Sequence, residues 1–442
     1  MALTGRTALL ALLGAVLVGL LRPDVGGVLT VTVSVLVLAV VDALLAGSPA
    51  ELEITRSADA RIRLGESATT GLTLTNTGRR PVRGLLRDAW PPSAGATPRR
   101  LAVDVPAGQR LLVTSALHPT RRGDRHAVRV TVRSVGPLGL AARQRSRVVP
   151  GSVRALPAFA SRRHLPSRLA RLRELDGASP LAIRGQGTEF DALREYVRGD
   201  DVRSIDWRGT ARGGGVVVRT WRPERDRSVF LVLDCGRTSS GRLQSGEGPT
   251  TRLDVLLDAA LLLVALATRA GDRVGLVVLD RAIRAQLRNP SRARALAQVS
   301  EVTAAVEPSL VETDHRLLTR TVLTRAPAGS LVVVLTGLDG PVVRDGLRPA
   351  LRPLLRRHMV VVAAVTDPAS LIGSPAPAAV SGRGEEVAAA YAAGAAARDR
   401  LDRADSAGLL ERDGVIVLDE PPDTVAPRLA DTYLDLKRAG RL

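Results

Sequence analysis

Two acidic residues, Asp234 and Asp339, lie where a metal or acid–base site could be built. Asp234 directly follows the apolar run 228–233, and Asp339 follows the run 331–335 after a short Thr-Gly-Leu spacer. Both runs are typical of buried β-strands, and ligands of parallel sheets bind at the carboxyl ends of the strands. Two carboxylates brought together there would repel each other, so a cation or an arginine must offset their charge. Arg237 is the nearest basic residue in the sequence.

The composition of the 442 residues excludes several kinds of catalytic centre. Lys437 is the only lysine and is followed by an arginine, so the chain has no Walker A loop. Cys235 is the only cysteine, which excludes disulfides within the chain and cysteine-type zinc sites. The five histidines are scattered, and neither a serine-hydrolase elbow nor a dinucleotide-binding glycine motif is present. No recognisable catalytic constellation therefore marks the chain as an enzyme.

The elements that would position the acids begin with two apolar runs at the N-terminus. Residues 7–21 and 25–41 carry no charge, and a turn at 22–24 that contains proline separates them. The pattern predicts a transmembrane helical hairpin over residues 1–47. Arginines at both ends of this hairpin predict a cell-membrane protein with the bulk of the chain in the cytoplasm. A signal peptide followed by a buried strand is the alternative interpretation.

Residues 50–150 show short stretches with period-two alternation, separated by Gly, Pro and Asn turn signals. This pattern predicts an all-β immunoglobulin-like sandwich. Residues 51–150 hold 18 arginines against seven acidic residues, a large part of the net charge of +19. The basic surface could press against an anionic membrane surface, or it could be a solvated face. Nucleic acid is an unlikely partner because aromatic residues make up 2% of the chain.

Residues 151–227 form an arginine-rich linker and a dense mixture of Arg, Asp and Glu around one tyrosine and one tryptophan. We expect an ion-paired clasp in which Trp207 is buried as an anchor against the next domain. The run closely resembles the signature of the bacterial family called domain of unknown function 58. The resemblance singles out signature residues with a structural role, which are Glu189, Arg194, Glu195, Tyr196, Asp200, Arg203, Asp206, Trp207 and Arg212.

The resemblance extends beyond this run. It includes the membrane hairpin, an Arg-Arg-Gly turn at 121–123 and a Tyr-Leu-x-Leu-Lys ending at 433–437. Relatives in this family are commonly encoded beside MoxR-type AAA ATPases. The resemblance therefore implies such an ATPase as partner, and a role in the assembly or maturation of other proteins.

Residues 228–442 alternate between strand and helix patterns, which predicts a Rossmann-like α/β domain. The arrangement is similar to von Willebrand factor type A domains, which hold a divalent cation through Asp-x-Ser-x-Ser, a separate threonine and a later aspartate. The resemblance implies a metal site for Mg²⁺ or Ca²⁺, whose oxygen ligands would be Asp234, Thr238, Thr313 and Asp339. Gly236 stands where those domains have the first serine, so the site would be degenerate.

Three functions follow as expectations. The first is a membrane-tethered protein-interaction or assembly factor that works through the type A-like domain. The second is a metal-dependent phosphoester hydrolase, which ranks lower because we expect no histidine or lysine in the loops around Asp234 and Asp339. The third is an envelope-binding module that faces outward.

Overall fold

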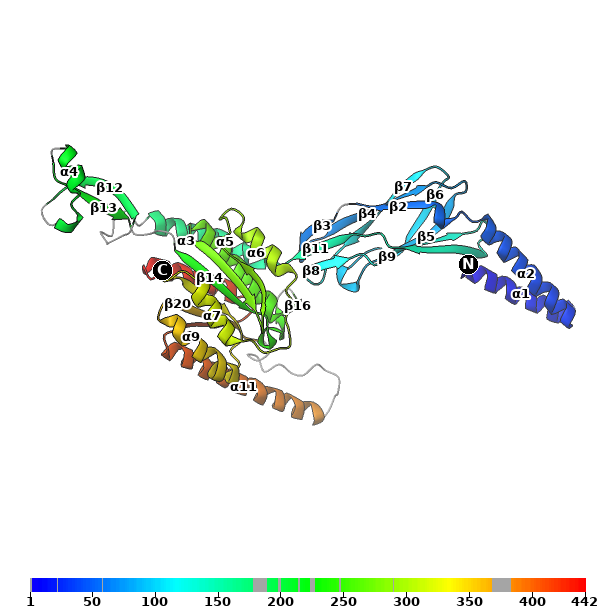
Figure 1. Ribbon diagram of the computed structural model, residues 1–442. Helices are drawn as coiled ribbons and strands as arrows, with labels where there is room; N and C mark the ends of the chain where they lie inside the picture. Colours follow the sequence, from blue (N-terminus) through cyan, green and yellow to red (C-terminus); the bar gives the residue numbers. More distant parts are fainter. Residues whose placement is uncertain are drawn as a thin grey trace. The chain divides into compact units, whose positions relative to one another are not determined.

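The computed structural model describes residues 2–21, 23–57, 59–177, 189–197, 200–213, 215–222, 227–245, 248–288, 290–367 and 383–442. The chain is a mixed α/β protein with several sheets (Figure 1). It forms two compact units, Met1–Ala158 and Phe159–Leu442. The first unit contains the predicted hairpin and sandwich segments. The second contains most of the predicted linker and the α/β segment.

Two apolar helices form an N-terminal hairpin, α1 (Gly5–Leu21) and α2 (Val25–Leu45), and each contains a single charged residue, Arg6 in α1 and Asp42 in α2. Asp24 caps α2 by accepting a 2.5 Å hydrogen bond from the backbone N–H of Gly27. The helices approach closely at Gly14, where a Cβ atom would lie 2.4 Å from Val31 Cγ1. The segment Val25–Glu51 is long and apolar enough to cross a membrane, with a mean hydropathy of 2.6, and α1 is shorter. The first unit therefore begins with an apolar helix that could span a membrane.

The rest of the first unit consists of three antiparallel or mixed sheets. The largest has the strand order β1-β10-β9-β5-β6, a second has β2-β4-β7, and a third has β3-β11-β8. Apolar side chains of the first two sheets form one core, with Leu74 and Leu86 fully buried. The strands are β1 (Ala2–Leu3), β2 (Leu52–Arg56), β3 (Ala60–Arg63), β4 (Ala68–Asn76), β5 (Val82–Ala89), β6 (Leu101–Val105), β7 (Arg110–Leu117), β8 (Gly123–His126), β9 (Arg129–Val135), β10 (Ala141–Arg147) and β11 (Ser152–Leu156).

Asp42, near the end of α2, fixes the hairpin to this sheet structure. Its carboxylate is fully buried and accepts hydrogen bonds from the backbone N–H groups of Leu138, Leu140 and Ala141 at 2.7, 2.7 and 2.9 Å. A Cβ atom at Gly136 would lie 2.4 Å from the Asp42 carboxyl carbon, so this turn requires glycine. Strand β1, which precedes α1, also pairs with β10. The helices and the sheet are therefore linked at both ends of the hairpin.

The second unit is built on a six-stranded sheet with the order β18-β17-β14-β19-β20-β21. Its strands are parallel except β18, which pairs antiparallel with β17. The strands are β14 (Ser228–Asp234), β17 (Arg273–Leu279), β18 (Ile283–Leu287), β19 (Leu331–Leu335), β20 (Met359–Val365) and β21 (Ile416–Glu420). A separate small hairpin consists of β15 (Arg242–Ser245) and β16 (Gly248–Thr251).

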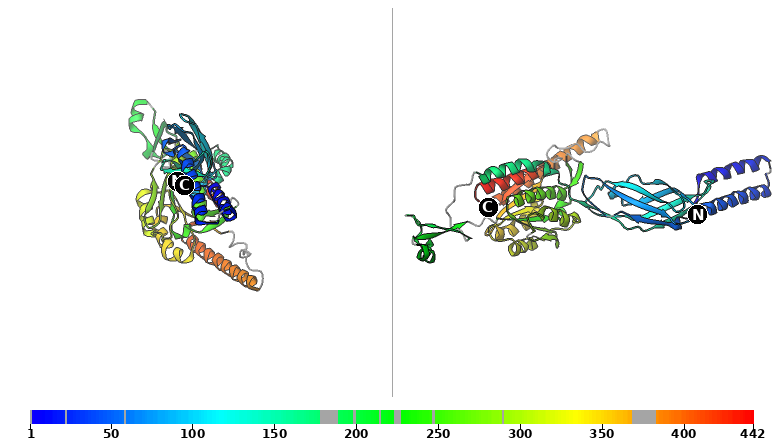
Figure 2. Two further views of the ribbon diagram at one scale, coloured as in Figure 1. Left: turned by 90° about the vertical axis from the view of Figure 1, so that its right-hand side faces the viewer. Right: turned by 90° about the horizontal axis from the view of Figure 1, so that it is seen from above.

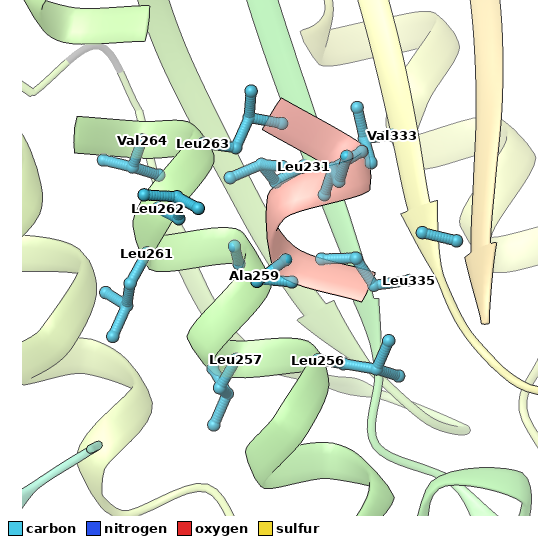
Figure 3. Close-up of a cluster of buried hydrophobic side chains, with 14 of the residues drawn as sticks. Leu231, Leu256, Leu257, Ala259, Leu261, Leu262, Leu263, Val264, Val333 and Leu335 are labelled. Carbon is cyan, nitrogen blue, oxygen red and sulfur yellow. The ribbon is translucent and has the colours of Figure 1, made fainter. Parts of the chain in front are cut away.

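Helices cover both faces of the six-stranded sheet, with a separate core on each side (Figure 2). On one face, α5 packs its leucines against Leu231, Val333 and Leu335 of the sheet (Figure 3). Alternate residues such as Val232 point into the core on the other face. The helices are α3 (Leu165–Gly177), α5 (Arg252–Arg269), α6 (Ala295–Ala304), α7 (His315–Arg325), α8 (Gly340–Val342), η6 (Val343–Leu347), α9 (Arg348–Leu355), α11 (Arg383–Arg412) and α12 (Val425–Arg438).

The Tyr-Leu-x-Leu-Lys ending lies in α12 and closes one face of the sheet. Tyr433 is 1% exposed, and its hydroxyl donates to the carboxylate of Asp272. Lys437 Nζ also donates to Asp272, at 3.1 Å, and to the carbonyl of Ala270 at 3.2 Å. The signature at the C-terminus therefore attaches α12 to the turn between α5 and β17.

Candidate functional site

Asp234 is the centre of a hydrogen-bond cluster at the carboxyl end of β14. Asp234 is 1% exposed. Oδ1 accepts from the backbone N–H of Gly236 at 2.8 Å and from the hydroxyl of Thr313. Oδ2 accepts from the hydroxyls of Thr238 at 2.9 Å and Thr336 at 2.6 Å. Four neutral donors thus hold a buried carboxylate, and among the described residues no Arg or Lys forms an ion pair with it.

Three loops supply these donors because their strands and backbones are joined at the same edge. Strands β14 and β19 are parallel neighbours with Leu233 opposite Leu335, so the residues that follow them, Asp234 and Thr336, emerge side by side. The loop after β14 is held by the backbone of residues 309–311. Arg237 N–H donates to the carbonyl of Val311, and Ser309 N–H donates to the carbonyl of Cys235, each at 2.8 Å. This second connection brings Thr313 to Asp234.

Gly236 is required by the close approach of Thr313. A Cβ atom at position 236 would lie 2.3 Å from Thr313 Oγ1 and 2.8 Å from the carbonyl oxygen of Val311. Both contacts are shorter than real Cβ atoms show, and the second involves backbone. The Thr313 hydroxyl therefore takes the space that a serine side chain at 236 would need.

Asp339 lies at the same edge of the sheet but outside the hydrogen bonds of Asp234. It precedes α8 and is half-buried. Its charge acts on Arg252, the first residue of α5, whose Nη1 donates to the carbonyl of Thr238 at 2.6 Å. Burial lowers the pKa of Arg252, and the charge of Asp339 acts in the opposite direction. The arginine beside the cluster is thus Arg252.

Of the two ways to offset the charge of the acids, a cation or an arginine, the structure does not use Arg237, which among the described residues forms no ion pair with Asp234. Its guanidinium pairs with Glu312 at 3.1 Å, and both side chains are more than half exposed. Arg237 follows Asp234 closely in sequence, but its side chain leaves the cluster toward solvent, where an ion pair adds little stability. Arg252 was missed because it is distant in sequence. Its place at the start of a helix that follows a strand could have identified it, since such helix starts lie at the carboxyl edge.

The loops that contain Asp234 and Asp339 hold no histidine, but a histidine from the loop before α7 lies near the cluster. His315 begins α7, directly after the capping residue Asp314. Burial lowers the pKa of His315, while the negative charge of Asp234 partly opposes this effect. The imidazole is therefore neutral near pH 7. Cys235 is buried, and burial together with Asp280 and Asp234 raises the pKa of its thiol to about 12.

The signature residues fold into a small hairpin of β12 (Glu189–Glu195) and β13 (Val217–Arg222), with η4 (Val202–Ser204) and α4 (Trp207–Gly213) between them. Arg194 pairs with Asp200 at 2.5 Å. Asp206 pairs with Arg219 at 2.9 Å, and this contact lowers the pKa of Asp206. The predicted ion-paired clasp is therefore present within the signature itself.

Several signature residues contribute through their backbones. Tyr196 N–H donates to the carbonyl of Val216 at 2.8 Å, and Arg203 N–H donates to Asp201 at 3.0 Å. Glu195 is exposed and lies opposite Val217. The side chains of Glu189 and Arg212 lie outside the described part of the structure.

The prediction that Trp207 is buried is wrong. Its side chain is 67% exposed. Trp207 is the first residue of the short helix α4, and the Asp206 carboxylate holds that helix through the N–H groups of Arg208 and Gly209. These hydrogen bonds position α4 without any contribution from the indole ring.

The cluster offers oxygen ligands only. The carboxylate of Asp234 and the three threonine hydroxyls are the kinds of group that Mg²⁺ and Ca²⁺ accept. Within the described ranges, no group of three or more His, Cys, Asp and Glu side chains gathers as a metal site. A buried carboxylate that has only neutral donors can attract a cation.

Comparison with known proteins shows a family match over part of the chain. Residues 192–372 match the family model described as "Protein of unknown function DUF58". The chain carries a DUF58 region. The family predicted from the signature is therefore confirmed over that stretch, which contains most of the signature and the Asp234 cluster.

Relatives of the DUF58 region are found in mycobacteria. Uncharacterized proteins of Mycobacterium bovis and Mycobacterium tuberculosis are 29% identical over 197 residues, which is 42% of this chain. The match spans 57% of the length of each of these relatives.

Two solved structures show a weaker likeness. A conserved hypothetical protein, BatB, from Bacteroides thetaiotaomicron is 17% identical, with a TM-score of 0.30, over 48% of this chain and 99% of that one. An uncharacterized membrane-spanning protein from Vibrio fischeri is 14% identical, with a TM-score of 0.16, over 48% of this chain and 98% of that one.

Proposed function

We propose that this protein is a membrane-tethered interaction factor whose α/β unit binds a partner protein through a divalent cation at Asp234. The observation that carries the proposal is the convergence of Thr238, Thr313 and Thr336 on one buried carboxylate. The resemblance to von Willebrand factor type A domains implies that two of these three threonines, Thr238 and Thr313, are metal ligands. The mostly parallel sheet, covered by helices on both faces, supports the same resemblance.

The donor set fits a hard cation. Asp234, Thr238, Thr313 and Thr336 would hold it, and each of these hydroxyls would then turn a lone pair toward the cation. When bound, the cation would supply a positive charge that a carboxylate of the partner could neutralise. One protein carboxylate leaves a dication only partly neutralised, so the remaining charge favours an acidic residue of the partner.

The membrane part of the proposal rests on the N-terminal hairpin. The apolar helices α1 and α2 expose leucine and valine side chains along most of their length, which suits contact with lipid. We propose that both helices span the membrane and that the immunoglobulin-like sandwich and the α/β unit face the cytoplasm. A reporter fused to the C-terminus tests this orientation. A reporter active on the outer face would instead favour the envelope-binding module.

A MoxR-type AAA ATPase is the proposed partner, on the basis of the family resemblance. The test is co-purification of the full chain in detergent with the MoxR-type ATPase of the same genome, in Mg²⁺ and in EDTA. Retention of the ATPase is expected in Mg²⁺ and not in EDTA, and Asp234→Asn should abolish it. The matched control is Asp405→Asn, an exposed acid on α11 that lies outside the cluster. Equal retention by both variants would contradict the proposal.

One observation favours a second candidate function. His315 is neutral and near Asp234, so it could act as the base that a metal-dependent phosphoester hydrolase needs. Phosphatase assays with and without Mg²⁺ test this function. Activity that is lost in His315→Gln would support hydrolysis, and absence of activity in the wild type would exclude it.

A further inference from the structure

The outer face of the largest sheet in the first unit carries a basic groove of about 610 Å³. Strands β5, β9 and β10 form its floor, and Trp90, Pro91 and Pro92 lie at one end. Its lining contains the arginines 87, 100, 129 and 133. No Asp or Glu lines the groove, and all of its lining residues belong to the described part of the chain.

The strand register places these arginines in successive rows. Leu85 and Gln144 flank Arg133 in the first row. Arg87 lies opposite Thr131 in the second row, and Ala89 lies opposite Arg129 in the third. Each row therefore contains one arginine. Because adjacent rows are two residues apart on β9, the arginines recur about every 7 Å along the strand direction, with Arg87 displaced sideways onto the neighbouring strand β5.

This spacing matches that of alternate side chains in an extended peptide, which also recur about every 7 Å. We propose that the groove binds an acidic segment of a partner protein in an extended conformation, with Asp or Glu at alternate positions. The basic lining provides the charge complementarity. The exposed apolar side chains of Leu85 and Val128 would contact the aliphatic parts of such a segment.

Two features favour a peptide over other polyanions. Trp90 is the one aromatic residue in the lining, and the guanidinium of Arg56 already covers a face of its ring at 5.0 Å. This leaves little surface on which nucleic-acid bases could stack. Asp88 further fixes the ring by accepting from Trp90 Nε1 at 2.8 Å and by pairing with Arg56 in a buried ion pair.

Lipid headgroups reach only one end of the groove if α1 and α2 lie in the membrane. Leu3, directly before α1, pairs with Ala141 on β10, and the strands run away from the hairpin (Figure 1). Arg133, which donates to the carbonyl of Leu3 at 3.1 Å, lies near that end. Arg129 lies four residues farther along β9, about 13 Å beyond Arg133, whereas a headgroup layer is roughly 5–8 Å thick.

The test measures binding of a fluorescein-labelled eight-residue peptide of alternating Glu and Thr to the full chain in nanodiscs of neutral lipid. The double variant Arg87→Gln/Arg129→Gln should raise the Kd roughly tenfold, since each exposed ion pair is worth up to about a fivefold change. The matched double variant Arg79→Gln/Arg110→Gln removes two exposed arginines outside the groove and should leave the Kd unchanged. A peptide with Gln in place of Glu should not bind.

Three results would overturn the proposal. Equal weakening by both double variants would show that only net charge matters. Tighter binding of an eight-residue oligothymidine, with the same dependence on Arg87 and Arg129, would assign the groove to nucleic acid. Loss of peptide binding when the nanodiscs contain phosphatidylglycerol would assign it to lipid. Because Arg87 and Arg129 are exposed, the melting temperature of their double variant should match that of the wild type.

Discussion

Thr336 Oγ1 donates a 2.6 Å hydrogen bond to Oδ2 of Asp234, although 102 positions separate the two residues in the sequence. The contact exists because β14 and β19 are parallel neighbours that end at the same level. Both residues are almost completely buried, so water cannot replace the hydroxyl if it is lost. The stability of the second unit therefore depends on the donors around Asp234.

Thr336→Val is expected to lower the free energy of unfolding by about 1–3 kcal/mol, because a buried acceptor loses a donor while the side-chain volume is kept. Thr324→Val is the matched control, since the Thr324 hydroxyl is exposed and donates only within its own helix. Chemical unfolding of the full chain in detergent measures both. Equal effects of the two variants would show that the Thr336 hydroxyl adds nothing specific.

The attachment of the hairpin at Asp42 can be tested locally. Asp42→Ala leaves three backbone N–H groups in the segment 138–141 without an acceptor, at a cost of about 1–3 kcal/mol for each buried group. Hydrogen exchange in this segment should become faster while exchange in the second unit stays unchanged. Asp104→Asn, which breaks an exposed ion pair with Arg83, serves as control. Unchanged exchange in segment 138–141 of the Ala variant would mean that Asp42 does not fix the hairpin.

We expect the second unit to become less stable in acid because the carboxylate of Asp413 becomes protonated. Hydrogen bonds from Arg348, at 2.7 and 3.0 Å, lower the pKa of Asp413 to about 2. The folded state therefore holds this group ionised more strongly than the unfolded state does. Its stabilising contribution is complete above about pH 4, the ordinary value for aspartate, and disappears as the pH falls toward 2.

Urea unfolding between pH 2 and pH 6 checks this dependence. The difference in stability between the wild type and Asp413→Asn should be largest at pH 6 and should vanish near pH 2. Arg352→Gln should have a smaller effect than Arg348→Gln, because the Arg352 side chain is 60% exposed and its contact is longer, at 3.3 Å. A difference between wild type and Asp413→Asn that does not change with pH would exclude the ion pair as its cause.

Much of the α/β unit could be predicted from the sequence. The apolar runs at 228–233 and 331–335, which predict buried strands, are β14 and β19. These predictions succeeded because fully buried strands and helices require continuous apolar side chains. The first residues of the segment 151–227 were harder to predict. Ser152–Leu156 pairs with β3 of the first unit, whereas Ser161 is hydrogen-bonded to Asp258 of α5 in the second.

The candidate site was harder to predict from the sequence, because its geometry depends on contacts between loops that are distant in the sequence. Asp339 was chosen for its charge, yet the hydroxyl of Thr336, three residues earlier, is the group that contacts Asp234. Ligands bind at the carboxyl ends of parallel strands, and a search of those ends for hydroxyl groups as well as carboxylates would have identified Thr336. Trp207 was expected to be buried because tryptophan is rare in this chain. Rarity, however, does not determine burial when the neighbouring polar groups hold the local fold.

Isothermal titration of Mg²⁺ and Ca²⁺ into the full chain in detergent tests the central claim most directly. The proposal predicts one bound cation for the wild type and for Asp405→Asn, and none for Asp234→Asn. It also predicts that saturation with the cation raises the melting temperature of the wild type, as expected for a ligand that binds only the folded state. The absence of cation binding to the wild type at millimolar concentration, or unchanged binding to Asp234→Asn, would contradict the account.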